Sequence, residues 1–470
     1  MRHQESNKYV RYHIETKSTS EVEKWPSRFN VKVGRVALAK FLINEILHYG
    51  PMNHQVILSR PCIYGVFSGP VGGFMPRPHH CVGCLRCTTE FPEFITVTPN
   101  PERRKLGDSY FTFNFVDTLS YEVEEGSIPV KGAGYRGRFG GEGWDCMWTD
   151  MSEIVRPTRD GIHGREFIST VADIGYKPNF LTLDEAGQPT GPIPNVISIP
   201  LPMLFDAASP SMSNEKIWRS AAYAAEGIRS LAIIPLDGVL KYGLQNDHVT
   251  PLVKPGDEEK LGSLRTPCLI ELDGWNESFY DLLRQKFPDS LISLRIPFSA
   301  SERLLEYIKK GIHVFHFLAD FHGRDPNGRF ALELIREAHA ILVKAGIRDE
   351  VTLLGSGGMI AAEHIPKAVL CGLDAIALDS PLVVALQGKF VGECADRASS
   401  RFVLPKNLPI EWGKQRLMNL AASWRDQLLE ISGAMGIRET RRMRGEMGRA
   451  LLMVNLEAEA FAGIDGYERG

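Results

Sequence analysis

The stretch LLGSGGMIAAEHIPKAVLCGLDAIALDSPLVVAL (353–386) contains the pattern that decides the fold. A short apolar run ends in the glycine-rich turn 355–358, a helix-like stretch follows, and a second apolar run ends at Asp379 and Ser380. Strands that alternate with helices pair in parallel, because each crossover helix packs back on the sheet. The stretch therefore predicts two neighbouring parallel strands joined by a helix.

The same alternation extends upstream through more than 150 residues. The apolar runs are 195–204, 230–236, 248–254, 268–272, 290–296, 312–320, 351–355 and 374–378, with helix-like stretches at 214–228, 276–287, 299–311, 327–346 and 361–372. Eight runs predict an α/β fold, an eight-stranded parallel β/α barrel of the TIM type. An open doubly wound sheet is the alternative, because runs 230–236 and 248–254 are the weaker strand candidates.

The loops that follow the last two predicted strands suit a phosphate group. Gly355, Gly357 and Gly358 would let backbone N–H groups approach an anion at a helix N-terminus. In β/α barrels a phosphate site is frequently built from the loops after strands 7 and 8. Asp379 is at odds with this, since a carboxylate repels a phosphate unless it points away.

Composition and charge limit the class of protein. The chain has 470 residues, is 43% hydrophobic and 24% charged, and has a net charge of −3. This is ordinary globular composition, without the basic excess of a nucleic-acid binder. No apolar run reaches the roughly 18 residues of a membrane span, and the N-terminus lacks an apolar signal region. We expect a cytoplasmic protein with an arm and cysteine module at 1–150, the barrel at 151–395 and a helical extension at 396–470.

The cysteine module is centred on CVGCLRCTTEFP (81–92), where Cys81, Cys84 and Cys87 are spaced C-x2-C-x2-C. Two-residue spacers let one loop present three thiolates to an iron–sulfur cluster. The bacterial ferredoxin pattern has its fourth cysteine where this chain has Phe91. We expect a remote fourth ligand, with Cys62 preferred over Cys146.

Other metal states stay open at this point. A 4Fe–4S cluster is favoured, and a three-ligand 3Fe–4S cluster is the next possibility. Structural zinc, with His79 or His80 as fourth ligand, is a further alternative, as is no metal at all.

Polar residues at the ends of two predicted strands are candidates for chemistry. Arg295 ends the run 290–296, where a cation needs an anionic ligand or an ion-pair partner. Asp320 and His322 lie in ADFHGRDPNG (319–328), a loop that could transfer a proton or merely cap a helix. RPTRDGIHGRE (156–166) is either a salt-bridged linker or a ligand contact. The glycine-rich stretch 132–143 is either a connector or a binding loop.

From 150 to 390 these residues resemble the FMN-binding domain of glutamate synthase, in particular short glutamate-synthase-like proteins with a ferredoxin-type module. The octapeptide 202–209, PMLFDAAS, is similar to the family's PMSFGALS strand, whose backbone lies along the flavin. The resemblance implies FMN as cofactor and assigns the following residues to it: Pro202, Met203, Leu204, Arg295, Gly355, Gly357, Gly358, Asp379 and Ser380. It also implies catalytic roles for Arg295, His322 and Asp320.

The chain departs from the family pattern at several places. The family's GEGG is Pro235-Leu236-Asp237-Gly238 here, only 254–256 remains of its QGAKPG loop, and its barrel lysine is Arg295. Arginine does not give up a proton as lysine can. These differences put 2-oxoglutarate amination in doubt.

Three functions are consistent with this pattern. The first is an FMN- and iron–sulfur-dependent oxidoreductase acting on the CH–NH2 group of an amino acid, or on an imine/oxo-acid pair. The second is a non-catalytic flavin and iron–sulfur electron-transfer subunit of a larger complex. The third is a zinc-stabilised barrel that binds a phosphorylated metabolite. In the first two cases we expect an electron-donor or acceptor protein, or additional subunits, and an oligomeric assembly.

Overall fold

The computed structural model describes residues 12–50, 62–68, 74–127, 143–149, 168–191 and 193–460. They form two compact units. Glu23–Phe113 is called the cysteine module below, and the described residues of 12–22 and 114–460 are called the barrel unit. Among the helices described, none combines the length and the apolar character needed to cross a bilayer.

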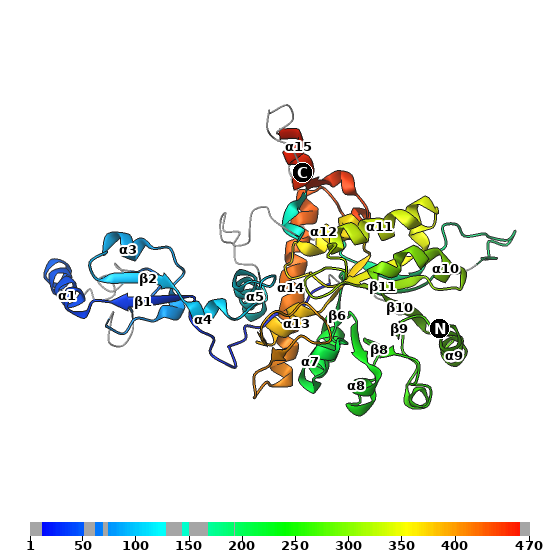
Figure 1. Ribbon diagram of the computed structural model, residues 1–470, viewed down its shortest axis with the longest axis horizontal. Helices are drawn as coiled ribbons and strands as arrows, with labels where there is room; N and C mark the ends of the chain where they lie inside the picture. The colour runs from blue at the N-terminus through cyan, green and yellow to red at the C-terminus, as the bar shows by residue number, and fades with distance from the viewer. Residues whose placement is uncertain are drawn as a thin grey trace. The chain divides into compact units, whose positions relative to one another are not determined.

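Eight parallel strands close into a barrel in the order β6-β7-β8-β9-β10-β11-β12-β13, which confirms the predicted fold. Strands β6 and β8 to β11 are labelled in Figure 1. Their bounds are β6 Met203–Asp206, β7 Ala232–Pro235, β8 Val249–Val253, β9 Leu269–Asp273, β10 Leu291–Pro297, β11 Val314–Leu318, β12 Thr352–Ser356 and β13 Ala375–Leu378. The barrel closes where β13 pairs with β6, with Ile376 opposite Met203. Both of the weaker strand candidates are barrel strands.

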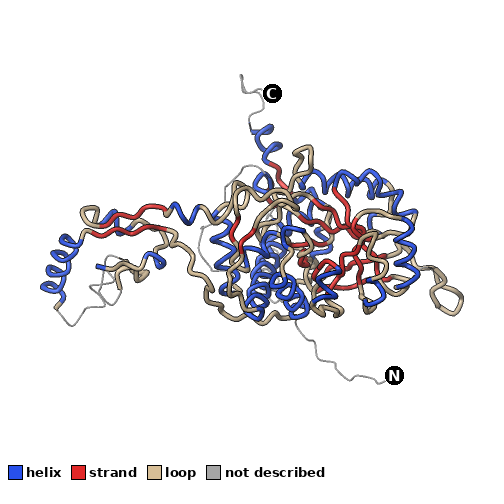
Figure 2. Tube along the Cα trace, turned by 60° about the horizontal axis from the view of Figure 1, so that its bottom comes forward, coloured by secondary structure: helices blue, strands red, loops and turns tan. Residues whose placement is uncertain are grey.

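Helices surround the strands, as the tube view shows (Figure 2). They are α7 Glu215–Ile228, α8 Leu236–Lys241, α9 Glu277–Lys286, α10 Leu304–Lys309, α11 Ala331–Lys344, α12 His364–Cys371 and α13 Ser380–Ala385. Asn214 and Asn276 cap α7 and α9, each accepting a hydrogen bond from a first-turn N–H. The predicted helix 299–311 is a 3-10 turn, Phe298–Arg303, followed by α10.

The first predicted strand, 195–204, is divided in two. Its first half is β5 (Asn195–Ile199), which pairs antiparallel with β4 (Ala172–Tyr176), and the barrel strand β6 begins only at Met203. The Thr352 hydroxyl at the start of β12 hydrogen-bonds to the Gly175 backbone. The hairpin packs its apolar residues on the barrel core. It therefore closes the N-terminal end of the barrel.

The barrel unit includes more of the chain than the sequence indicated. Helix α14 (Ile410–Ala434) packs on α7, and α5 (Phe113–Glu125) is bound to α14 by the Glu122 carboxyl, which accepts hydrogen bonds from Trp424 and Gln427. The observed division thus differs from the expected boundaries at 150 and 395. A buried side-chain contact between distant segments is not visible in local composition.

The N-terminal segment also belongs to this unit. The Tyr12 hydroxyl donates to the Ile228 carbonyl, and the Val22 N–H donates to the Gln387 side chain. Residues 12–22 are therefore held on the barrel unit. Over these residues the expected N-terminal arm is therefore part of the barrel unit.

The cysteine module is built on a two-stranded antiparallel sheet. Its elements are β1 Phe29–Val33, α1 Arg35–Tyr49, α3 Arg86–Glu90, β2 Ile95–Pro99 and α4 Pro101–Arg104. Val31 and Val33 lie in β1, opposite Val97 and Ile95. Both valines pack on the module core, and this contact favours a strand.

The remaining elements follow the barrel or connect to its surface. They are β14 Lys389–Phe390, β15 Phe402–Val403, β16 Ala450–Leu452, which pairs with β3 Met147–Thr149, and α15 Met453–Ala460. Within the expected helical extension 396–470, the basic stretch 438–452 contains short 3-10 turns and β16. Arg444 explains part of this, because it pairs with the buried Asp374.

Candidate functional site

A polar layer fills the C-terminal half of the barrel interior. On most strands a polar residue stands two positions after an apolar core residue, so both side chains point inward. The pairs are Leu204 and Asp206, Leu269 and Glu271, Val314 and His316, Leu354 and Ser356, and Ala377 and Asp379; on β10, Arg295 stands four positions after Leu291. The apolar layer is part of the hydrophobic core, and the polar layer lies next to it, toward the C-terminal ends of the strands.

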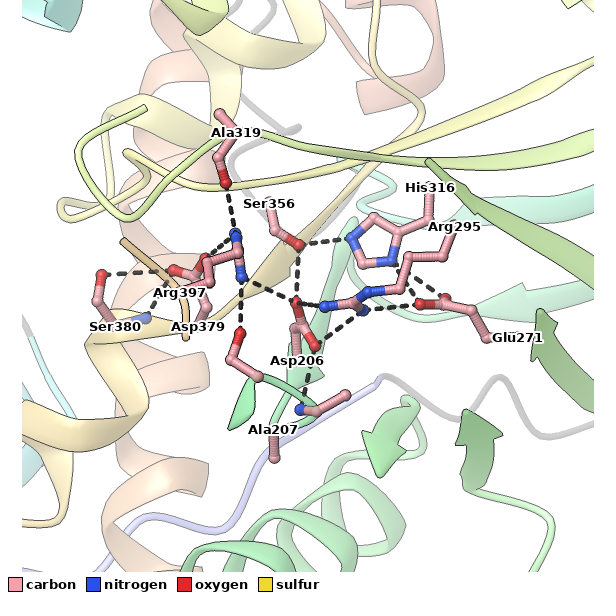
Figure 3. A network of polar contacts seen from close by, with 12 residues as sticks. Asp206, Ala207, Glu271, Arg295, His316, Ala319, Ser356, Asp379, Ser380 and Arg397 are labelled. Atoms are coloured by element: carbon pink, nitrogen blue, oxygen red, sulfur yellow. Dashed lines mark hydrogen bonds and ion pairs between the residues drawn. The ribbon is translucent and has the colours of Figure 1, made fainter. Parts of the chain in front are cut away.

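Arg295 is the centre of this layer (Figure 3). Its guanidinium donates to both oxygens of Asp206, at 3.1 and 3.0 Å, and to Glu271 at 2.7 Å. Arg295 is 4% exposed and both carboxylates are fully buried. Burial disfavours the charged forms, but the ion pairs outweigh it: the pKa of Asp206 is lowered and that of Arg295 is raised. Both groups are therefore held ionised.

His316 extends the network on the other side of Glu271. Its Nδ1 lies 2.9 Å from a Glu271 oxygen, and its Nε2 lies 2.5 Å from the Ser356 hydroxyl. The Ser356 hydroxyl in turn donates to Asp206 at 3.0 Å. Because an ionised carboxylate only accepts hydrogen bonds, the His316 Nδ1 is placed to donate to Glu271. His316 thereby links Glu271 to Ser356 and, through the serine hydroxyl, to Asp206.

Arg397 closes the C-terminal end of the barrel from the loop between β14 and β15. Its guanidinium donates to the Ala319 carbonyl at 2.6 Å, the Ser209 hydroxyl at 2.9 Å and the Asp379 carboxylate at 2.5 Å. It also lies 4.9 Å from the centre of the Phe321 ring. Burial raises the pKa of Asp379, while Arg397 lowers it. One side chain therefore joins the loops after β6, β11 and β13 (Figure 3).

The residues expected along the flavin are buried in the barrel wall. The Pro202 carbonyl accepts the Ile376 N–H, and the Met203 carbonyl accepts the Ser230 hydroxyl. Leu204 belongs to the apolar layer. The backbone groups of Pro202 and Met203 are thus already in use within the barrel wall.

The two expected phosphate loops are also filled from within. A Cβ added at Gly357, which has a φ of +100°, would lie 2.3 Å from the Asp320 carbonyl oxygen, and one at Gly355 would meet Leu373. The Gly358 N–H donates to the Phe321 carbonyl, and the Ser380 N–H donates to Asp379. These glycines serve close packing between loops.

These residues do not fit FMN in the position that the resemblance implies. Where the family motif PMSFGALS has glycine, this chain has Asp206, whose carboxylate occupies the barrel interior. At the expected phosphate loop stands the Asp379 carboxylate, and the nearby cation Arg397 is already bound to it. Arg295 lies in the ion-pair arrangement that the sequence left open, with both partners inside the barrel.

The two other predicted catalytic residues share the loop that follows β11. The half-buried Asp320 accepts a hydrogen bond from the Arg324 N–H at 2.7 Å. Burial raises the pKa of Asp320, and the Arg324 N–H and the nearby His322 lower it. The structure places this loop at the C-terminal end of the barrel, with its backbone against Gly357.

The four cysteines named from the sequence line a common cavity in the cysteine module. Cys62, Cys81, Cys84 and Cys87 surround it together with apolar residues that include Val31. An adjoining cavity of about 170 Å³ is lined by three of these cysteines and by Ile63, Tyr64 and Arg86. Segments 19 residues apart in sequence therefore bring four sulfur donors to one place.

Electrostatics and backbone geometry support the closeness of these thiols. Burial raises the pKa of Cys81 and of Cys87, and the neighbouring thiols of the set raise it further. The loop turns through two left-handed residues, Gly83 with a φ of +73° and Leu85 with a φ of +59°. A Cβ on Gly83 would lie 2.2 Å from the Phe29 ring. Glycine is therefore favoured at this turn.

The alternative ligands named from the sequence are Cys146, His79 and His80. Cys146, the second choice, is in the barrel unit, where burial raises its pKa and Lys367 lowers it. His79 and His80 belong to a short 3-10 turn, Pro78–His80, just before the cysteine loop. The stretch 156–166 and all but the last residue of 132–143 lie outside the described residues.

The sequence reasoning did not single out five members of the barrel network. These are Asp206, Glu271, His316, Ser356 and Arg397. Four of them stand in or at the end of predicted apolar strands, at the inward phase, and this was a usable signal. Arg397 gave no such signal, because it lies beyond the last strand in an irregular loop.

The chain is similar to a known protein family and to individual proteins named glutamate synthase. The family model described as the conserved region in glutamate synthase matches residues 324–438. An archaeal glutamate synthase (NADPH) of Archaeoglobus fulgidus is 30% identical over 467 residues, covering 82% of this chain and 89% of that protein. An archaeal-type glutamate synthase (NADPH) of Dehalococcoides mccartyi is 23% identical over 434 residues, covering 78% and 86%.

Solved structures with similar folds were also found. Mandelate oxidase with benzoyl-formic acid has a TM-score of 0.38 and 14% identity, covering 63% of this chain and 97% of that chain. A flavocytochrome b2 variant with sulfite bound has a TM-score of 0.40 and 10% identity, covering 69% and 90%.

A closed parallel β/α barrel with an attached four-cysteine module defines the class of protein to which this chain is assigned. Within that class, the extent of the Archaeoglobus fulgidus match shows that the chain belongs to the glutamate-synthase-like family.

Proposed function

We propose that this protein is an electron-transferring oxidoreductase component of the glutamate-synthase-like class. Its redox group is an iron–sulfur cluster, with 4Fe–4S favoured, held by Cys62, Cys81, Cys84 and Cys87. The observation that carries the proposal is the convergence of these four sulfur donors on one cavity. Four thiolates are the ordinary ligand set of such a cluster.

The module offers what a cluster site requires. The cysteine loop supplies three thiolates from one turn, and Cys62 supplies the fourth from a separate segment. Val66 and Phe67 are buried beside them and exclude water from the inner side. Cys84 is exposed, so one edge lies close to the surface of the described module. A bound cluster would take up and release one electron at a time.

This arrangement implies protein partners on both sides of the electron path. An electron-donor protein would supply one electron, and an acceptor protein or subunit would take one, so the chain itself has no net change. The relatives are named glutamate synthases that use NADPH, which supports an oxidoreductase role. We place the amino-acid or imine/oxo-acid chemistry on a partner subunit, because the polar residues of this barrel are bound to one another.

Anaerobic purification of the full chain, with iron, sulfide and zinc analysis and a visible spectrum, tests the proposal. We expect iron and sulfide, and a broad absorption that dithionite bleaches. Cys84→Ser should lose most of the iron. Cys268→Ser is the matched control, because Cys268 is an exposed cysteine of the barrel unit and its loss should leave the iron content unchanged.

Two outcomes would refute the iron–sulfur assignment. One is about one zinc per chain with no sulfide, which would favour the zinc-stabilised alternative. The other is full iron retention in Cys84→Ser, which would show that Cys84 does not hold the iron.

A further inference from the structure

We propose that the barrel of this chain is closed by its own ion-pair network and does not bind FMN. The network of Asp206, Glu271, Arg295 and His316, together with Arg397, takes the place that the family relation assigns to the flavin. This inference is independent of the cluster in the cysteine module. Under this proposal, the barrel interior is a structural core and holds no cofactor.

The first argument is charge balance. Arg295 and the doubly hydrogen-bonded His316 face the carboxylates of Asp206 and Glu271, so the inner cluster has no excess of positive charge. Arg397 is likewise paired with Asp379. A phosphate group carries two negative charges and would have to displace a carboxylate from each cation it approached. Such exchange leaves an unpaired buried carboxylate, which is strongly unfavourable.

The second argument is that the hydrogen-bond donors are already used. The Arg397 guanidinium donates to Ser209, Ala319 and Asp379 at 2.5–2.9 Å, and lies 3.5 Å from an Asp206 oxygen. At the phosphate loops, the N–H groups of Gly358 and Ser380 donate to neighbouring residues of the chain. Phosphate recognition at a loop needs such groups to be available.

The third argument is access. The β4–β5 hairpin covers the N-terminal end, with Gly175 bound to Thr352. At the other end, two backbone hydrogen bonds hold the loop between β14 and β15. The Phe321 N–H donates to the Ala395 carbonyl, and the Ser211 N–H donates to the Arg397 carbonyl. Asp206 is fully buried beneath this loop. A tricyclic ring could enter only after Arg397 had left all of its partners.

Flavin content and thermal stability of the full-length protein test this proposal. The protein is purified from cells supplied with riboflavin, incubated with excess FMN and desalted. Released flavin is then measured by fluorescence after denaturation. We expect far less than one FMN per chain, and a melting temperature that FMN does not change, since a ligand that binds the native state raises it. About one FMN per chain, or a clear rise in melting temperature with FMN, would overturn the proposal.

Arg397→Gln provides a second measurement that does not need flavin. If Arg397 acts as a structural closure, this variant should melt several degrees lower than the wild type, by the same amount with and without FMN. Arg401→Gln is the matched control, because Arg401 is an exposed residue of the same loop. The melting temperature of this variant should equal that of the wild type. An Arg397→Gln variant as stable as the wild type would contradict the closure. The iron content of the same samples reports separately on the cysteine module, so failure of one proposal is distinguishable from failure of the other.

Discussion

The cysteine module and the barrel interior both gather chemically active side chains, but they differ in what those side chains contact. The module brings four donors of one kind to a shared cavity. In the barrel, Arg295 and Arg397 are each bound to carboxylates of the same chain. We therefore propose a ligand for the first arrangement and none for the second.

If both proposals hold, this contrast distinguishes a ligand site from a barrel interior that is satisfied by its own ion pairs. A barrel strand can keep its position in the fold while one substitution at its end places a buried charge where the family has a neutral residue. Asp206 is such a change, since the family motif has glycine there and this chain has a buried carboxylate. Once present, that carboxylate needs a cation, and Arg295 supplies it. Likeness of fold alone does not decide which cofactor a barrel binds, so the cofactor has to be argued from the residues of the site.

The strongest test of the contrast is Arg295→Ala. This change leaves Asp206 and Glu271 buried without their main cation, which should lower the free energy of unfolding by about 3–5 kcal/mol. Urea denaturation followed by circular dichroism would measure the loss. Arg303→Ala is the matched control, because Arg303 pairs with Glu306 on the exposed surface and should show no measurable change. Equal stability of the two variants would show that the network contributes nothing.

A second prediction compares two buried carboxyl groups. Glu122 is hydrogen-bonded to the neutral side chains of Trp424 and Gln427, and burial raises its pKa to about 7. The native state therefore favours protonated Glu122, and stability is lost as pH rises from about 4.5 through 7, by up to about 3 kcal/mol. Asp206 has a lowered pKa, so its contribution is present above the usual aspartate pKa and is lost as pH falls through the lower native value.

Glu122→Gln should remove the first of these slopes and leave the second. Denaturant titrations of the wild type and the variant at pH 5, 6, 7 and 8 would show the difference, with the variant gaining on the wild type as pH rises. Parallel curves over this range would mean that Glu122 is ionised in the native state at every pH.

The smallest expected effect concerns the turn of the cysteine loop. Gly83→Ala adds a Cβ at a positive φ and against the Phe29 ring, so we expect the module to lose about 1–3 kcal/mol and to hold less iron. Gly65→Ala is the control, because Gly65 also has a positive φ but its Cβ would meet nothing within 4 Å. Amide hydrogen exchange of the module would compare them. A larger loss in Gly65→Ala would contradict the role of the Phe29 contact.

Much of the fold could be predicted from local pattern. Apolar runs separated by amphipathic helices identified seven barrel strands and the first two residues of β6, because strand and helix periods differ along the chain. The β4–β5 hairpin was missed, since run 195–204 reads as one strand although Pro200 and Pro202 interrupt it. The contact of Glu122 with α14 was also invisible, because it joins residues about 300 positions apart.

The candidate site was less accessible to sequence reasoning. The spacing of Cys81, Cys84 and Cys87 indicated that these three cysteines share one site. The structure brings Cys62 to the same cavity. In the barrel, Arg295 was noticed as a cation at a strand end, but its partners on β6 and β9 were not. Which charges meet across a barrel depends on register and shear, and one strand's sequence contains neither.

The way Arg295 is shared by two carboxylates has a consequence for how this protein can change over time. A descendant with glycine at position 206 would leave Arg295 with a single strong anionic partner. A descendant without Arg295 would leave two buried carboxylates without their cation. Positions 206, 271 and 295 are thus expected to be inherited as a set. In chains where position 206 is glycine, position 295 should be free to become lysine, as in the family pattern.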